Sequence, residues 1–132
     1  MSLLCGCAHP HLLPLLGYSL EKDACLVFPL MRGGSLADRL WPGEANSQHL
    51  GRLGLRLPLA PLSWRELLRI LRQTIGALLY LHTADPTSGK GVVLHRDFKP
   101  ENILLDEQLR CASAWVASGL IDARLHGYLA IQ

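Results

Sequence analysis

The strongest hydrophobic pattern in the chain lies between residues 64 and 82, where apolar side chains recur every three or four positions. Ser63 stands just before this pattern and Glu66 three residues later, which is the arrangement of a capping box at the start of a helix. The spacing predicts a long amphipathic helix with arginines on its other side. We expect this helix to belong to the core, with an apolar face made of Trp64, Leu67, Leu68, Leu71, Ile75, Leu78 and Leu79.

Shorter patterns precede this helix. The apolar runs 12–16 and 25–30 flank the polar residues 21–23, and two such runs around a charged turn predict an antiparallel pair of strands. A glycine-containing joint follows the second run. Beyond it, Ser35 with Asp38 three residues later predicts the N-cap of a short helix.

The remaining segments carry weaker patterns. Residues 41–62 and 83–91 are rich in glycine, proline and polar side chains without a steady period, so both predict loops. Residues 92–94 are apolar and predict a return of the chain to the core. They lead into residues 95–106, where several charged side chains run directly into three branched aliphatics. The tail, residues 111–132, has no strong period and predicts only weak strand and helix.

Composition limits the class of protein. A chain of 132 residues with 49% hydrophobic content is the size and type of one globular domain. The net charge of +2 is spread along the chain, so no basic stripe indicates a nucleic-acid partner. The apolar runs are far shorter than the roughly 20 residues that cross a bilayer, which predicts no transmembrane segment. The four cysteines lack the spacing of a disulfide framework and no signal peptide is evident, so we expect a reducing compartment.

The polar stretch at 95–106 reads HRDFKPENILLD and resembles the catalytic loop of eukaryotic protein kinases, H-R-D-x-K-x-x-N. The segments HPHLLPLLGY, CLVFPLM and MRGGSLADRL resemble the parts of that domain that lead into the hinge and the helix after it. These segments are most similar in sequence to the receptor-like and interleukin-receptor-associated serine/threonine kinases, and the resemblance covers about residues 8–110. The resemblance implies an α+β fold that is protein-kinase-like but truncated.

The same resemblance implies how the chain is divided. Residues 1–31 would be the end of the small lobe and the hinge. Residues 32–110 would hold the first helices of the mainly helical large lobe, together with the catalytic loop. Residues 111–132 would be a divergent tail.

The resemblance also implies roles for the loop residues. Asp97 would orient or accept the proton of the substrate hydroxyl, Lys99 would stabilise the moving phosphoryl charge, and Asn102 would hold a magnesium ion. His95 would pack the loop onto the core, and Arg96 would pair with a phosphorylated activation loop. The position of the lysine is typical of serine/threonine rather than tyrosine kinases. The alternative is that these are solvated charges on a turn.

A nucleotide pocket follows from the resemblance as well. Leu104 would form the floor of an adenine pocket, Met31 would offer hinge backbone groups, and Ser35 would lie near the ribose. Phe28 would stand at the gatekeeper position. The alternative for Phe28, Met31 and Leu104 is ordinary core packing.

Several parts of the family pattern are missing. The chain contains no Gly-rich loop, and no strand lysine paired with a helix glutamate. Where Asp-Phe-Gly is expected, residues 113–117 read Ser-Ala-Trp-Val-Ala, and Asp122 comes too late to replace it. We therefore expect a truncated product, a spliced form or a faulty gene model, and no measurable phosphotransfer by the isolated chain.

Three function classes follow. The first is a serine/threonine kinase domain fragment that uses ATP and Mg²⁺ on a protein substrate. Its expected location is cytoplasmic, with a signalling complex at a membrane as a candidate partner. The second is a non-catalytic fragment that binds a partner through apolar faces of residues 12–30 and 64–82 left uncovered by the truncation. The third is a small metal-binding protein, because sulfur and nitrogen ligands alternate at Cys5, Cys7, His9 and His11.

Overall fold

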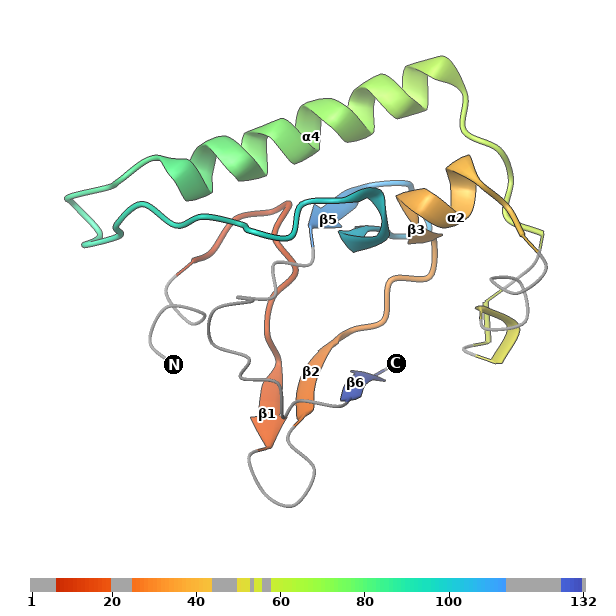
Figure 1. The fold of residues 1–132 in the computed structure, drawn as a ribbon, viewed down its shortest axis with the longest axis horizontal. Coiled ribbons are helices and arrows are strands. Elements are labelled where there is room, and N and C mark those ends of the chain that lie inside the picture. The colour runs from red at the N-terminus through yellow and green to blue at the C-terminus, as the bar shows by residue number, and fades with distance from the viewer. Residues whose placement is uncertain are drawn as a thin grey trace.

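The computed structural model describes residues 7–19, 25–43, 50–52, 54–55, 58–113 and 127–131. In this part of the chain, a long helix lies across one three-stranded sheet, and a second three-stranded sheet lies on the side away from the helix (Figure 1). The mixture of helices and strands confirms the α+β class. No helix in the described ranges is both long and apolar enough to cross a membrane.

The long helix, α4, spans Trp64–His82, as the sequence pattern predicts. Its first turn is closed by the predicted capping box. The Ser63 hydroxyl accepts a hydrogen bond from the Glu66 N–H at 3.3 Å, and the Glu66 carboxylate accepts one from the Ser63 N–H at 2.7 Å. These bonds satisfy backbone donors that have no partner within the helix, which fixes where α4 begins.

The face of α4 that packs against the sheet is not the predicted one. The buried residues are Ile70, Thr74, Ala77 and Leu81. Five of the seven residues of the predicted apolar face are exposed: Trp64, Leu68, Leu71, Ile75 and Leu79. The helix has two apolar stripes side by side, and the stripe with the smaller side chains can approach the sheet more closely. The hydroxyl of Thr74 is compatible with burial because it donates to the Ile70 carbonyl oxygen at 2.8 Å.

The sheet beneath α4 has the order β3-β4-β5, all antiparallel, with bounds Gly34–Ser35, Ile103–Leu105 and Cys111–Ser113. Side chains alternate across the central strand β4. Ile103 and Leu105 pack with Ile70 of α4, whereas Leu104 packs against the cluster of the second sheet. The strand β4 therefore lies between two apolar clusters, and the loop that precedes it is anchored to the core.

The second sheet has the order β1-β2-β6, with bounds Gly17–Ser19, Cys25–Pro29 and Gly127–Ile131. The predicted antiparallel pair is confirmed, but its first strand is residues 17–19 rather than 12–16. Leu12 and Leu13 are buried core residues outside any strand, so their apolar character reflects packing. The predicted turn at 21–23 lies outside the described residues. In the tail, β6 pairs in parallel with all five residues of β2.

A tight joint connects the two sheets. The Gly33 N–H donates to the Leu105 carbonyl oxygen at 2.7 Å, and a Cβ at Gly33 would lie 2.4 Å from the Asp106 carbonyl oxygen. Only glycine allows this approach. The short helix α2, Leu36–Leu40, follows directly and carries the predicted cap of Ser35 and Asp38.

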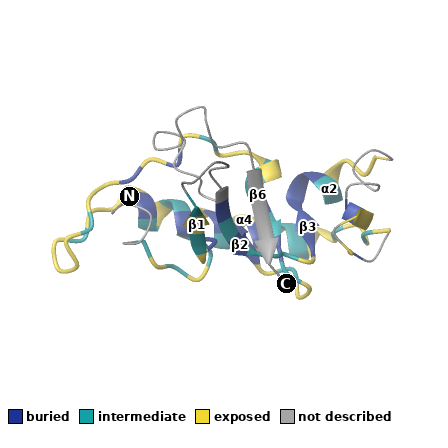
Figure 2. Cartoon of the chain, turned by 90° about the horizontal axis from the view of Figure 1, so that it is seen from below, coloured by how far each residue is buried: buried dark blue, intermediate teal, exposed yellow. Residues whose placement is uncertain are grey.

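In the described residues of the two connections beside α4, the backbone is mostly irregular, as predicted, with one helical turn at residues 50–52. Figure 2 shows mostly exposed residues in the described parts of these connections, and buried residues in β2, β3 and α4. After α4, the Asp85 carboxylate accepts hydrogen bonds from Thr87 and Ser88, which closes the loop. These bonds lower the pKa of the Asp85 carboxyl to about 2.

Candidate active site

The polar stretch begins where the chain returns from α4 to the core. The Val93 N–H donates to the Leu81 carbonyl oxygen at 2.8 Å, which ties the returning segment to the end of the helix. Val93 and His95 are buried, whereas Val92 and Leu94 are exposed. The predicted return to the core is therefore made by Val93 and His95, because an extended segment against a surface buries only alternate side chains.

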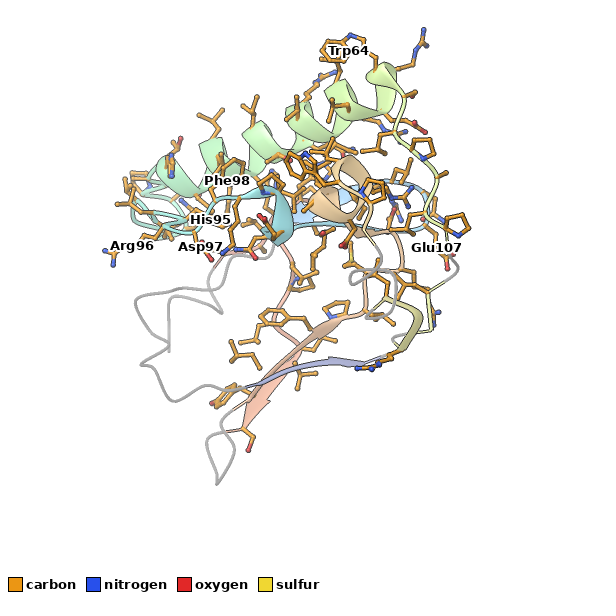
Figure 3. All side chains as sticks on the ribbon, turned by 45° about the vertical axis from the view of Figure 1, so that its right-hand side comes forward. Trp64, His95, Arg96, Asp97, Phe98 and Glu107 are labelled. Atoms are coloured by element: carbon orange, nitrogen blue, oxygen red, sulfur yellow. The ribbon has the colours of Figure 1, made fainter. Side chains whose placement is uncertain are left out.

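A tight turn follows at Arg96, whose φ of 59° is in the left-handed region. The Asp97 N–H donates to the His95 carbonyl oxygen at 2.8 Å and closes the turn. Phe98 packs edge-on against the His95 ring, with 5.6 Å between ring centroids. Sequence reasoning gave Phe98 no role, although a large apolar side chain among charges was a signal that it packs locally. Figure 3 shows His95, Asp97 and Phe98 close together below α4.

The three residues predicted to carry the chemistry lie together. The Lys99 Nζ is 3.0 Å from Oδ1 of Asp97. The Asn102 Nδ2 donates to Oδ2 of Asp97 and to the Asp97 carbonyl oxygen, both at 2.9 Å. Both oxygens of the Asp97 carboxylate are thus held by side chains of the same loop.

Local structure explains this grouping. A short 3-10 helix, η1 at Pro100–Asn102, turns the chain so that the Asn102 N–H donates to the Lys99 carbonyl oxygen at 3.0 Å. The next residue, Ile103, is buried in the α4 cluster and begins β4. The charged loop therefore lies between a buried histidine and a buried strand. The aliphatic residues that follow the charges belong to that strand, which explains why the two kinds of residue are adjacent in the sequence.

The electrostatics of the loop favour an ionised Asp97. The hydrogen bond from the Lys99 ammonium, and then that from the Asn102 amide, hold the pKa of the Asp97 carboxyl below its ordinary value. Burial lowers the pKa of the His95 imidazole, so His95 is neutral near pH 7. The carboxylate is consequently charged at neutral pH and able to accept a hydrogen bond or a proton.

Removing the Lys99 charge should shift the Asp97 titration toward higher pH. Because the folded-state pKa is lowered, the ionised carboxylate contributes stability above the ordinary carboxyl pKa and loses it as the pH falls through the lowered value. In Lys99→Met, we expect the midpoint of the Asp97 carboxyl carbon shift, followed by NMR, to rise toward that ordinary value. Arg32→Met removes a cation near Glu107 and should leave the midpoint unchanged. An unmoved midpoint in Lys99→Met would contradict this account.

The structure also brings together the three residues predicted to bind nucleotide. Ser35 and Leu104 are paired across β3 and β4, and Met31 and Leu104 pack against the same apolar cluster, which includes the buried Phe28. The Ser35 hydroxyl donates to Oδ2 of Asp38 at 2.7 Å in the α2 cap. The nucleotide role of these residues stays a prediction.

Of the side chains of the loop, Asn102 offers one oxygen of the kind that a magnesium ion takes as a ligand. Since Nδ2 of Asn102 makes both hydrogen bonds to Asp97, the carbonyl oxygen Oδ1 is the atom of that amide that would face a cation. Oxygen ligands are what Mg²⁺ prefers.

The alternative metal site near the N-terminus has no cluster of ligands among the described residues. Among the described residues, no three His, Cys, Asp or Glu side chains are grouped to hold a metal ion. His9 stacks on Tyr80 with 5.1 Å between ring centroids, and Nδ1 of His11 is 2.9 Å from the Cys111 carbonyl oxygen. Cys5 lies outside the described residues, as does Asp122.

Comparison with known proteins finds similarity to protein kinases. Residues 1–113 match the family model of the protein kinase domain. A probable L-type lectin-domain containing receptor kinase I.2 of Arabidopsis thaliana is 38% identical over 125 residues, 94% of this chain and 15% of that protein. The serine/threonine-protein kinase pelle of Drosophila melanogaster is 38% identical over 103 residues, 77% of this chain and 12% of that protein. The nodulation receptor kinase of Pisum sativum is 40% identical over 113 residues, 85% of this chain and 10% of that protein.

The chain therefore spans a small part of the length of these relatives, between 10% and 15%. The family model covers the joint, α4, the charged loop and both strands that flank the turn at Asp106. It ends at residue 113, slightly beyond the end at 110 that the sequence pattern indicated. Because this model matches residues 1–113 of the 132-residue chain, the chain belongs to the protein kinase domain family.

Proposed function

We propose that residues 95–106 are the catalytic loop of a serine/threonine protein kinase that transfers the γ-phosphoryl group of ATP to a protein hydroxyl. The observation that carries this proposal is the Asp97 carboxylate, ionised and held by Lys99 and Asn102 at 3.0 and 2.9 Å. Phosphoryl transfer needs little covalent chemistry from the protein. It needs an oriented hydroxyl and compensation of the phosphate charge, and this loop has groups suited to both.

Each residue then has one task. Asp97 accepts the hydrogen bond of the substrate hydroxyl and takes the proton of that hydroxyl. The lowered pKa of the Asp97 carboxyl keeps the group ionised at neutral pH, so the carboxylate is able to accept a proton. The Lys99 ammonium, adjacent to this carboxylate, stabilises the charge of the transferred group. Oδ1 of Asn102 would hold a magnesium ion, which would supply positive charge next to the phosphate oxygens. His95 and Phe98 keep the loop in position through their ring contact.

We further propose that the adenine lies against Leu104 and the hinge at Met31, with Ser35 near the ribose and Phe28 behind the pocket. The cross-strand pairing of Ser35 with Leu104 and the shared cluster of Met31 and Leu104 support this placement. In this reading residues 1–31 belong to the small lobe, 32–110 to the large lobe, and 111–132 to a tail. Arg96, exposed at the turn, would pair with a phosphorylated segment.

Protein kinases act on proteins, and several relatives are named receptor kinases. We therefore propose a protein substrate and a cytoplasmic location, with a signalling complex at the membrane as a candidate partner. The family match and the composition favour this function over a nucleic-acid-binding role.

A thermal melt of the full chain tests the nucleotide part of the proposal. Specific binding raises the stability of the folded state, by about 2.7 kcal/mol when the ligand is at 100 times its Kd. We expect the midpoint to rise with magnesium and ATP together and not with either alone. Asn102→Ala should lose this shift, whereas Glu101→Gln, an exposed residue of η1, should keep it. A midpoint indifferent to magnesium and ATP would contradict nucleotide binding by this chain.

A further inference from the structure

Arg39, in the short helix α2, joins two segments that lie on either side of it in the sequence. Its Nε donates to the Gly33 carbonyl oxygen at 3.0 Å, and its Nη1 donates to the Ala60 carbonyl oxygen at 2.8 Å. Gly33 lies in the joint between the two sheets, whereas Ala60 lies in the connection that leads to α4. We call these two contacts the Arg39 bridge. Because the guanidinium is planar and its donors are fixed in direction, the bridge fixes both carbonyl groups relative to α2.

The joint itself is a tight turn that the connection before α4 covers. The Gly34 N–H donates to the Met31 carbonyl oxygen at 3.2 Å, which closes the turn. Gly34 has a φ of 74°, and a Cβ at this position would lie 3.0 Å from Cδ1 of Leu59. The connection therefore packs on the joint through Leu59 and is bonded to α2 through Ala60. The Arg39 bridge lies where these three segments of the chain meet.

Placing a guanidinium here has an electrostatic cost. Burial lowers the pKa of the Arg39 guanidinium below its ordinary value, whereas the carboxylates of Glu66 and Asp38 raise it in part. The two hydrogen bonds of the bridge go to main-chain oxygens rather than to these carboxylates. Hydrogen bonds from a charged donor are stronger than neutral ones. The arrangement therefore suits a side chain that holds the backbone rather than one that pairs with an acid.

We propose that Arg39 is a positioning residue for the nucleotide and that it acts through the Gly33 carbonyl group. Gly33 lies between Met31 and Ser35, the residues proposed to contact the adenine and the ribose. A backbone that is held at Gly33 keeps these two residues in a fixed relation, so less conformational freedom is lost when nucleotide binds. This role rests on the proposed nucleotide site, and it adds to that site a residue that acts from outside the pocket.

Two simpler roles would give Arg39 no part in nucleotide binding. In the first, Arg39 stabilises only the helix α2, in whose last turn it lies. Its loss would then lower stability and leave the ATP affinity of the folded protein unchanged. In the second, Arg39 supplies only positive charge near Asp38 and Glu66. Lysine would then replace it without loss, because lysine keeps the charge but lacks the rigid fork that spans two carbonyl groups.

The test is the affinity of the full chain for ATP at saturating magnesium, measured by isothermal titration calorimetry. Thermal melts without nucleotide identify a temperature at which each variant is folded. We expect Arg39→Met to weaken ATP binding by about tenfold or more, and Arg39→Lys by about threefold or more. Arg65→Met makes the same chemical change at an exposed position of α4 and should bind ATP as the unmodified chain does. If Arg39→Met does not fold, Arg39→Lys decides the result.

Amide exchange tests the bridge without nucleotide. The Gly33 N–H donates to the Leu105 carbonyl oxygen in the joint, whereas the Val93 N–H donates to the Leu81 carbonyl oxygen at the end of α4. In Arg39→Met we expect exchange of the Gly33 amide with deuterium, followed by NMR, to be about tenfold faster or more, with unchanged exchange at Val93. An equal rise at Val93 would show a general loss of stability and would contradict a local role in the joint.

The two measurements separate failure of this role from failure of the proposed function. Unchanged Gly33 exchange in Arg39→Met would overturn the bridge whether or not ATP binds. ATP affinity equal to that of the unmodified chain in Arg39→Met or in Arg39→Lys, or equal weakening by Arg65→Met, would overturn the positioning role and leave the nucleotide site in place. No binding of ATP by the unmodified chain would refute the nucleotide site and, with it, the role of Arg39 there.

Discussion

Replacing Asp97 by asparagine should lower phosphoryl transfer by about a hundredfold or more when this loop stands in an active kinase domain. Asparagine has the shape of aspartate and can still accept the hydrogen bond from Asn102 Nδ2. It has neither the negative charge that pairs with Lys99 at 3.0 Å nor the ability to take a proton. The change therefore removes the proposed proton acceptor and leaves the loop in place.

The measurement is a loop graft, because the loop can be tested in a complete kinase. Residues 95–106 replace the corresponding loop of pelle, a serine/threonine-protein kinase that is 38% identical to this chain over 103 residues. We expect the graft to keep transfer to within about tenfold of the parent, the Asp97→Asn graft to lose it, and the Glu101→Gln graft to match the unmodified graft. A folded graft that binds ATP but transfers no phosphoryl group would refute the assignment of the loop.

The close grouping of the three residues proposed to carry the chemistry could be predicted from the sequence because it is local. Asp97, Lys99 and Asn102 lie within six residues, and their hydrogen bonds are made inside one loop. The same holds for the cap of α2, where Ser35 and Asp38 were predicted from a three-residue spacing. Spacing along the chain specifies such contacts directly, without knowledge of the rest of the fold.

Longer-range features were less predictable. The first strand of the pair lies at residues 17–19, not 12–16, because burial of Leu12 and Leu13 in the core produces the same apolar run as a strand does. The strand β6 has no clear sequence signal. Its residues are extended where they pair with β2, and the local sequence does not reveal a contact with such a distant segment. Strand propensity depends on context, and the context here comes from distant residues.

The helix α4 has one feature that was predicted correctly and one that was predicted wrongly. Its bounds were predicted correctly because the capping box and the helical period are local signals. Its buried face was predicted wrongly because two neighbouring stripes are apolar, and only contact with the sheet chooses between them. Two isoleucines of the same helix, Ile70 on the buried face and Ile75 on the exposed apolar face, therefore distinguish the observed packing of α4 from the predicted one.

Truncating these isoleucines to alanine should give very different losses of stability. Ile70 is fully buried among Leu36, Ile103 and Leu105, so Ile70→Ala removes apolar contacts and leaves a cavity. We expect a loss of about 3 kcal/mol in the free energy of unfolding, within the roughly 2–5 kcal/mol typical of such changes. Ile75 is 63% exposed, and Ile75→Ala should change stability by no more than about 0.5 kcal/mol.

Urea unfolding of the three proteins measures both values, and an unchanged slope with denaturant would show that the same surface is exposed on unfolding. The two substitutions are chemically identical and sit on one helix, so differences in helix propensity cancel and burial alone separates them. Equal losses would mean that both stripes of α4 are covered, and a larger loss for Ile75→Ala would mean that the stripe with Ile75 faces the core. Either result would contradict the placement of α4 on the sheet β3-β4-β5.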